Sequence, residues 1–314
     1  MPEKFGICGV RKNIGGKLYA LNYGRAISES IDPIEKKPLF HFLPGTHTLS
    51  VATVGCNLKC GNCQNWQISQ SVKEDKNLLE IAQGLTPEEI IKDAIKNKCP
   101  SISYTYTEPT IFLEYALDIM KPAKEKNIKN IWVTNGFMSS KTLQLITPYL
   151  DAANIDLKSF DDKFYKENCG ASVGPILDNL KKMKKNAIWI EITTLVIPSF
   201  SDENKMLESI ASFIFNELGS ETPWHVSAFS GIISYKMQNI PDTPVKTICK
   251  AYDIGKRMGL KYVYAGNIMD NSRENTYCPK CDKLVIERIG FMTNRLDKNG
   301  KCGKCGENLN LIQN

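Results

Sequence analysis

The chain has 314 residues, enough for one large domain or two smaller ones, and its 42% hydrophobic and 24% charged residues are typical of a globular protein. No run of 18 apolar residues occurs, so no membrane-spanning helix is expected, and the first residues lack the apolar stretch of a secretory signal. The net charge of +6 comes from lysines spread along predicted helices without interleaved aromatic residues, so no nucleic-acid partner is expected. Eleven cysteines, seven of them in metal-like spacings, without an export signal, indicate a reducing cytoplasmic location and not a disulfide framework.

Short β-rich runs alternate with amphipathic helical stretches from about residue 48 to residue 265. The predicted strands cover residues 49–54, 102–106, 130–134, 154–157, 189–197, 225–229 and 261–264. The predicted helices cover residues 111–126, 141–150, 176–186, 202–218 and 244–258, and one more begins after Thr86. Thr86 is the expected N-cap of that helix, Pro87 its first residue, and Glu89 closes a capping box. Six β/α units and a last strand predict a parallel α/β fold, a partial (β/α)6 barrel short of the complete eight units.

Three cysteines lie within eight residues directly after the first predicted strand. Cys56, Cys60 and Cys63 have the spacing C-x3-C-x2-C. A [4Fe–4S] cluster normally takes four thiolates, so three on one loop can hold three irons and leave the fourth iron open to another ligand. There are two alternatives: a zinc site that lacks one ligand, or a set of thiols buried in the core. Zinc motifs more often use paired C-x2-C knuckles, and core thiols have no reason to cluster in the sequence. The spacing therefore favours an iron–sulfur site.

The other strands of the predicted barrel also end in polar or turn-forming residues. Glu108 follows the second strand, Asn135 the third, and Asp156 and Lys158 lie at the end of the fourth. Because the chemistry of such barrels sits at the carboxyl ends of their strands, we expect these side chains to surround the same site as the cysteine loop.

The tail after about residue 271 is predicted to be a separate metal-binding unit. Its four cysteines form a C-x2-C-x20-C-x2-C arrangement: Cys278, Cys281, Cys302 and Cys305. Two such knuckles complete a tetrahedral site, and a unit of this size needs the metal for its folding energy. Zinc is the expected ion, with rubredoxin-like iron or a second cluster as alternatives. The predicted division is then residues 1–47 as an extension packing on the barrel, 48–270 as the barrel and 271–314 as the metal-binding unit.

Several longer motifs carry a family resemblance. They are residues 15–24 (GGKLYALNYG), 32–45 (DPIEKKPLFHFLPG), 63–69 (CQNWQIS), 104–109 (YTYTEP), 223–227 (PWHVS) and 262–267 (YVYAGN). Together they resemble the radical-SAM enzyme of the AmmeMemoRadiSam system, related to pyruvate formate-lyase activating enzyme-like proteins, over nearly the whole chain. Members usually carry a longer cysteine-rich N-terminus, of which Cys8 remains. The four cysteines outside both motifs are scattered along the chain and are expected to be free thiols: Cys8, Cys99, Cys169 and Cys249. The wider superfamily often has Gly-Gly-Glu where this chain has Tyr106-Thr107-Glu108.

The resemblance implies how S-adenosylmethionine (SAM) is used and bound. SAM would chelate the open iron of the cluster. An electron from the cluster would then cleave SAM and release a 5′-deoxyadenosyl radical. Glu108 resembles the carboxylate that binds the SAM amino group, and Asp156 and Lys158 resemble the Asp-x-Lys of glycyl-radical activases. Asn135 would bond the ribose or carboxylate of SAM, or act as a turn residue. His225 would help to bind substrate or SAM, or be a structural histidine.

Three functions follow from these patterns. The leading one is a radical SAM enzyme that abstracts hydrogen from a peptide glycine, another protein side chain or a small metabolite, with an electron donor such as ferredoxin or flavodoxin. The second is an electron-transfer protein with two metal sites and no SAM chemistry, which would not need Glu108. The third is a nucleic-acid-modifying protein that uses the tail as a reader, which would need a clustered basic surface.

Overall fold

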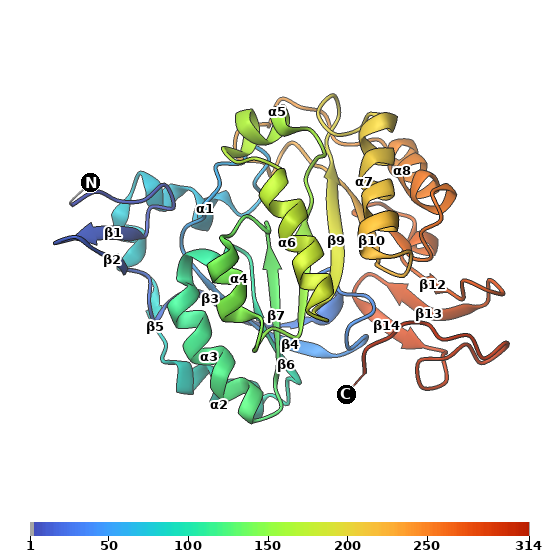
Figure 1. The fold of residues 1–314 in the computed structure, drawn as a ribbon, viewed down its shortest axis with the longest axis horizontal. Coiled ribbons are helices and arrows are strands. Elements are labelled where there is room, and N and C mark those ends of the chain that lie inside the picture. Colours follow the sequence, from blue (N-terminus) through green and yellow to red (C-terminus); the bar gives the residue numbers. More distant parts are fainter. Residues whose placement is uncertain (1–2, 314) are drawn as a thin grey trace.

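One long sheet organises the computed structural model, which describes residues 3–313 (Figure 1). The strands of this sheet lie in the order β11-β10-β9-β8-β7-β6-β4-β3-β5. Seven neighbouring strands of this sheet pair in parallel. They are β4 His47–Thr53, β6 Ser101–Tyr104, β7 Lys129–Thr134, β8 Ala152–Asp156, β9 Trp189–Val196, β10 Trp224–Ala228 and β11 Val263–Gly266. The predicted partial barrel of parallel strands is confirmed, because each predicted strand overlaps one of these.

The longer helices connect the parallel strands and pack against them (Figure 1). They are α2 Pro87–Lys96, α3 Leu113–Glu125, α4 Ser140–Ile146, α6 Gly174–Lys185, α7 Asn204–Phe213 and α8 Val245–Arg257. The capping box of α2 is confirmed: Thr86 Oγ1 accepts from the Glu89 N–H at 3.2 Å, and the Glu89 carboxylate accepts from the Thr86 N–H at 2.8 Å. Helix α4 ends at Ile146, before its predicted limit at residue 150, and Pro148 has no N–H group with which to continue the helical hydrogen bonds.

Short helical turns fill several connections between strands and helices. They are η1 Ile34–Lys36, α1 Trp66–Ser69, η2 Ser71–Lys73, η3 Lys76–Leu79, η4 Pro109–Phe112, α5 Asp162–Phe164, η5 Tyr165–Cys169, η6 Ile214–Leu218 and η7 Asn271–Arg273. Two of them, η5 and η6, are π-helical turns. Among residues 3–313, no helix has the length and hydropathy needed to cross a membrane.

The N-terminal part of the chain adds strands that the sequence patterns did not reveal. Strands β1 Arg11–Ile14 and β2 Lys17–Ala20 form an antiparallel hairpin. Strand β3 Arg25–Pro33 pairs antiparallel with β4 and with the short β5 Gln83–Gly84. The N-terminal segment therefore extends the barrel sheet by an antiparallel edge, while the predicted domain boundaries themselves stay a prediction.

The tail forms a small antiparallel sheet that docks on the N-terminal segment (Figure 1). Its strands are β12 Thr276–Tyr277, β13 Leu284–Ile289 and β14 Met292–Arg295. Near the C-terminus, Ile312 exchanges backbone hydrogen bonds with His41 and Leu43, both at 2.8 Å. The buried Arg288 of β13 donates to the Phe40 carbonyl at 2.9 Å. Residues 40–43 thus join the tail to the barrel.

Candidate active site and metal centre

The carboxyl ends of the parallel strands open into a cavity of about 600 Å³. Its wall includes the cysteine loop at one end and the strand-end residues that the sequence analysis singled out. The predicted site residues that line it are Cys56, Cys60, Cys63, Glu108, Asn135, Asp156, Lys158 and His225. The fold thus brings together side chains that are up to 169 positions apart in the sequence.

A glycine sets the start of the cysteine loop. Gly55 follows β4 with a φ of +104°, which L side chains rarely adopt. A Cβ atom here would lie 2.8 Å from the Cys8 carbonyl oxygen and 2.9 Å from Val10. The Cys8-Gly9-Val10 segment therefore packs directly behind the loop, and Cys8 itself is buried.

The three loop thiols fit a cluster better than a single ion. Cys56, Cys60 and Cys63 all line the cavity, yet their sulfur atoms do not close within 4.8 Å of one another as the four tail sulfurs do. A single ion needs its ligands around one point, whereas a four-iron cluster spreads its thiolates around a larger body. Three thiols on one wall of an open cavity also leave the opposite side of such a cluster accessible.

Glu108 is buried and bonded, not a solvated acid. Its carboxylate accepts from the Thr110 N–H and hydroxyl, from the Thr134 hydroxyl at 2.8 Å, and from the Asn135 N–H at 2.9 Å. Three of these contacts go to Oε1 and one to Oε2, so Oε2 can accept a further donor from the cavity side. Burial raises the pKa of Glu108 against the effect of these hydrogen bonds. A cationic donor in the cavity would favour the charged carboxylate.

Asn135 lies beside the cysteine loop. Its side-chain amide donates to Asn57 Oδ1 at 2.8 Å and approaches Cys56 Sγ at 3.9 Å, while its Oδ1 accepts from the Phe137 N–H at 2.9 Å. The turn role foreseen for Asn135 is therefore present, and the same side chain positions the loop around Cys56.

Asp156 and Lys158 form an ion pair on the cavity wall. Lys158 Nζ lies 2.7 Å from Asp156 Oδ2. Burial by itself lowers the pKa of Lys158, but the Asp156 carboxylate and the nearby sulfur of Cys60 hold that pKa well above its ordinary value. The pair thus keeps a positive charge close to the cysteine loop.

His225 lies at the far end of the cavity, in a buried polar network. Its Nε2 is 2.8 Å from the Glu191 carboxylate, which also accepts from the Phe40 and His41 N–H groups at 2.9 and 2.8 Å. Burial by itself raises the pKa of Glu191, but its hydrogen bond and charge interaction with His225 hold it below the ordinary value. This network gives His225 a structural partner while its ring still faces the cavity.

The tail and the N-terminal segment close this far end. Glu35, Lys36 and Phe40 line the cavity from one side, and Glu274, Gly290 and Phe291 line it from the tail. Arg288 holds the two together, because its guanidinium stacks on the Phe40 ring at 4.0 Å and donates to the Glu274 carbonyl at 2.9 Å. Sequence reasoning missed Glu191 and Arg288, since neither lies in a recognisable motif.

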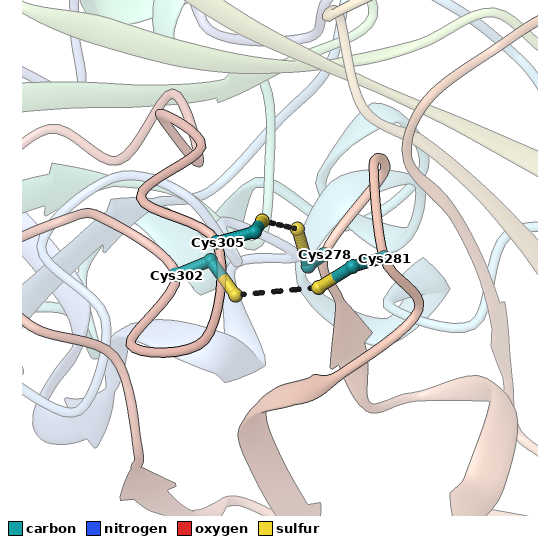
Figure 2. A group of neighbouring side chains, drawn as sticks. All are labelled: Cys278, Cys281, Cys302 and Cys305. Carbon is teal, nitrogen blue, oxygen red and sulfur yellow. Dashed lines mark hydrogen bonds between the residues drawn. The ribbon is translucent and has the colours of Figure 1, made fainter.

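The four tail cysteines converge on one point (Figure 2). Their sulfur atoms all lie within 4.8 Å of one another, with Cys278 and Cys305 at 3.5 Å and Cys281 and Cys302 at 3.6 Å. A tetrahedron with metal–sulfur bonds of about 2.3 Å has edges of about 3.8 Å. The site therefore has the size and donor set of a closed four-thiolate metal centre, as its spacing predicted.

Comparison with known proteins identifies the class to which this chain belongs. Residues 50–211 match the Radical SAM superfamily, so the chain is a member of it and an enzyme. It is 43% identical to an uncharacterized protein of Methanocaldococcus jannaschii over 98% of this chain and 90% of that protein.

More distant relatives carry names. The chain is 26% identical to the pyruvate formate-lyase-activating enzyme of Clostridium pasteurianum, over 69% of this chain and 90% of the relative. The structure of Streptococcus suis SuiB bound to S-adenosylmethionine shares the fold, with a TM-score of 0.55 and 15% identity over 78% of this chain and 56% of SuiB. The chain is thus a radical SAM, activating-enzyme-like protein, while its place in the AmmeMemoRadiSam system stays a prediction.

Proposed function

We propose that this enzyme reductively cleaves SAM at a [4Fe–4S] cluster held by Cys56, Cys60 and Cys63 and abstracts hydrogen from a substrate. The observation that carries the proposal is the shared cavity: three thiols and a buried carboxylate, Glu108, line the same space. When bound, the cluster supplies the electron that cleaves SAM into methionine and a 5′-deoxyadenosyl radical. An electron donor such as ferredoxin or flavodoxin would serve as the partner protein.

The residues of the cavity have distinct proposed tasks toward SAM. Oε2 of Glu108 accepts a hydrogen bond from the SAM amino group, a charge-assisted contact that orients the cofactor. Lys158, paired with Asp156, presents positive charge to the SAM carboxylate. Asn135 keeps Asn57 and Cys56 in place and leaves the cluster loop open toward the cavity.

The far end of the cavity is the proposed place of the substrate. It is walled by His225 and Tyr264 of the barrel, by Phe40 of the N-terminal segment, and by Glu274 and Phe291 of the tail. A substrate between these walls would lie apart from solvent, which protects a radical from quenching. A relative in Methanocaldococcus jannaschii that is named as a putative glycyl-radical enzyme activating enzyme supports a glycine of a protein partner as one substrate, and another protein side chain or a small metabolite would fit the same role.

Electron transfer without SAM chemistry is the less supported alternative. It would leave the cavity, the buried Glu108 and the Asp156–Lys158 pair without a task. The tail site supports a structural role instead, with zinc as the proposed ion, since its four thiols leave no coordination position open.

The decisive experiment is anaerobic reconstitution with iron and sulfide, followed by incubation with SAM and dithionite and an assay for 5′-deoxyadenosine. The proposal expects 5′-deoxyadenosine from the wild type and none from the Cys56→Ala/Cys60→Ala/Cys63→Ala variant. A matched control, Cys99→Ala/Cys249→Ala, removes two thiols outside both motifs and should retain the product. Equal product from the triple variant would refute the assignment of the cluster.

A further inference from the structure

The segment that carries Glu108 begins with a strained turn at Tyr106. The Thr107 N–H donates to the Thr105 carbonyl at 2.8 Å, and Tyr106 between them has a φ of +64°. A hydrogen bond across three residues with a positive central φ defines the rare and strained form of the γ-turn. A bulky L-residue persists in such a conformation only where its surroundings hold it there.

The side chain of Tyr106 is anchored in a buried polar network of the N-terminal segment. Its hydroxyl donates to Asp32 Oδ2, lies 2.8 Å from Ser30 Oγ and accepts from Lys37 Nζ at 3.3 Å. The same ammonium group lies 4.5 Å from the centre of the Tyr106 ring. Asp32 and Lys37 are both buried, so water does not compete for these contacts. The network thus fixes the ring and, through it, the backbone of the turn.

The network does not need the Tyr106 hydroxyl to balance the charge of Asp32. The carboxylate also accepts from Lys36 Nζ at 2.7 Å, from Lys37 Nζ at 2.6 Å and from Ser50 Oγ at 2.6 Å. Removing the hydroxyl therefore leaves no buried charge unpaired, and a Tyr106→Phe variant should still fold.

The backbone of the turn connects the cysteine loop to Glu108. The Tyr106 carbonyl accepts from the side-chain amide of Asn65, two residues after Cys63, at 2.9 Å. Residues 105–108 all line the cavity, and Glu108 follows the turn directly. A turn that relaxes to a negative φ would therefore move the start of η4 and the Glu108 carboxylate with it.

We propose that Tyr106 is a positioning residue for SAM, because its anchor to Asp32 and Lys37 holds the strained turn that places Glu108 for the SAM amino group. The inference rests on the proposed function, in which Glu108 binds SAM. The anchor sets the fraction of the enzyme whose turn has the binding-competent shape. The apparent affinity for SAM falls in proportion to that fraction.

The test uses the freedom of glycine at a positive φ. Tyr106→Gly loses the anchor but adopts the φ of +64° without strain, so its Kd for SAM should stay within about threefold of the wild type. Tyr106→Ala also loses the anchor, and its Cβ disfavours the turn. Its Kd should rise about five- to thirtyfold, the ratio that matches the penalty of one left-handed L-residue. Tyr106→Phe keeps the ring over Lys37 and should lie between these two. Equilibrium dialysis of the reconstituted variants with labelled SAM measures the Kd.

Hydrogen exchange of the Thr107 amide reports the turn itself in the cluster-free enzyme without SAM, because this N–H closes the turn. It should exchange faster in Tyr106→Ala and stay protected in Tyr106→Gly. Tyr115→Phe is the matched control. It removes the hydroxyl of another buried tyrosine, bonded to the Leu85 carbonyl at 2.7 Å outside the cavity, and should change neither measurement.

The outcomes separate the two proposals. A ring that only fills space would give the opposite order, because glycine removes the most packing and would weaken SAM binding more than alanine. That order, or an equal Kd in the glycine and alanine variants, refutes the role of Tyr106 alone. A wild type that binds no SAM refutes the proposed function and this inference with it. If Tyr106→Ala does not fold, Tyr106→Phe takes its place in the comparison with glycine.

Discussion

The chain holds two cysteine centres that are built in opposite ways. The loop of Cys56 to Cys63 has its thiols along one wall of a cavity, and its backbone is fixed by distant parts of a large core. The tail has four thiols that close on one point, over a small apolar cluster of Cys278, Val285, Cys302 and Leu309. An open ligand set leaves room for chemistry, whereas a closed set is typical of structural sites. The core around the loop can fold before any metal binds, whereas the tail depends on its ion.

The largest effect should come from removing the tail metal. Cys302→Ala opens the four-thiolate site, and structural zinc is worth on the order of 10–16 kcal/mol in small zinc domains. We expect hydrogen-exchange protection to be lost across residues 276–312 and kept in the barrel, while SAM cleavage continues. Metal analysis should fall from one zinc to none, with Cys249→Ala as the unchanged control. If the tail stays protected from hydrogen exchange without its metal, then the tail does not depend on its ion for folding, and the two centres do not differ in this respect.

A pH effect should follow from His41, which joins the tail to the barrel. Its Nδ1 bonds the Leu309 carbonyl at 3.1 Å and its Nε2 the Tyr264 hydroxyl at 2.6 Å, and burial lowers its pKa to about 4. Between pH 6.5 and about 4 the unfolded chain binds a proton that the folded chain does not. The free energy of unfolding should therefore fall by about 3 kcal/mol on acidification through this range.

Urea unfolding at pH 7 and pH 4.5 measures this effect. His41→Gln should flatten the pH dependence, while the exposed His47→Gln should leave it as in the wild type. An equally steep pH dependence in both variants would show that other groups control the acid sensitivity.

Glu108→Gln tests the open centre at the SAM end. Losing one charge-assisted hydrogen bond should weaken SAM binding by about 1.5–3 kcal/mol, or about ten- to a hundredfold in Kd. The cluster absorption should remain, because Glu108 is not a proposed iron ligand. Equilibrium dialysis with labelled SAM gives the affinity, with the exposed Glu217→Gln as control. Equal SAM affinities of the wild type and Glu108→Gln would show that Glu108 does not bind SAM. Its role would then be structural, through its hydrogen bonds to Thr134 and Asn135.

The smallest effect should come from removing the cluster. The loop is tied to η5 by protein hydrogen bonds, so cluster-free enzyme should keep the hydrogen-exchange protection of the barrel strands. Only amides of residues 55–63 should exchange faster. Widespread loss of protection would mean that the barrel, like the tail, depends on its metal.

The alternation of strands and helices was predictable from the sequence because local periodicity marks each element. The capping box at Thr86 was predictable for the same reason. Strand β3 was not, because it is a half-exposed edge strand with polar residues such as Ser28 and Ser30 and no clear apolar face. The contact of η5 with the cysteine loop was also not predictable, since a single cysteine such as Cys169, without spacing to others, carries no local signal.

The sequence by itself determined the two cysteine motifs and the alternation of strands and helices, because both are encoded over short spans. Only the tertiary structure decided which side chains meet across the sheet. It brought Asn168 to Gly61, Glu191 to His225, and the tail to residues 40–43. Such contacts depend on strand order and on the paths of loops, so they join residues far apart in the sequence that no local pattern connects.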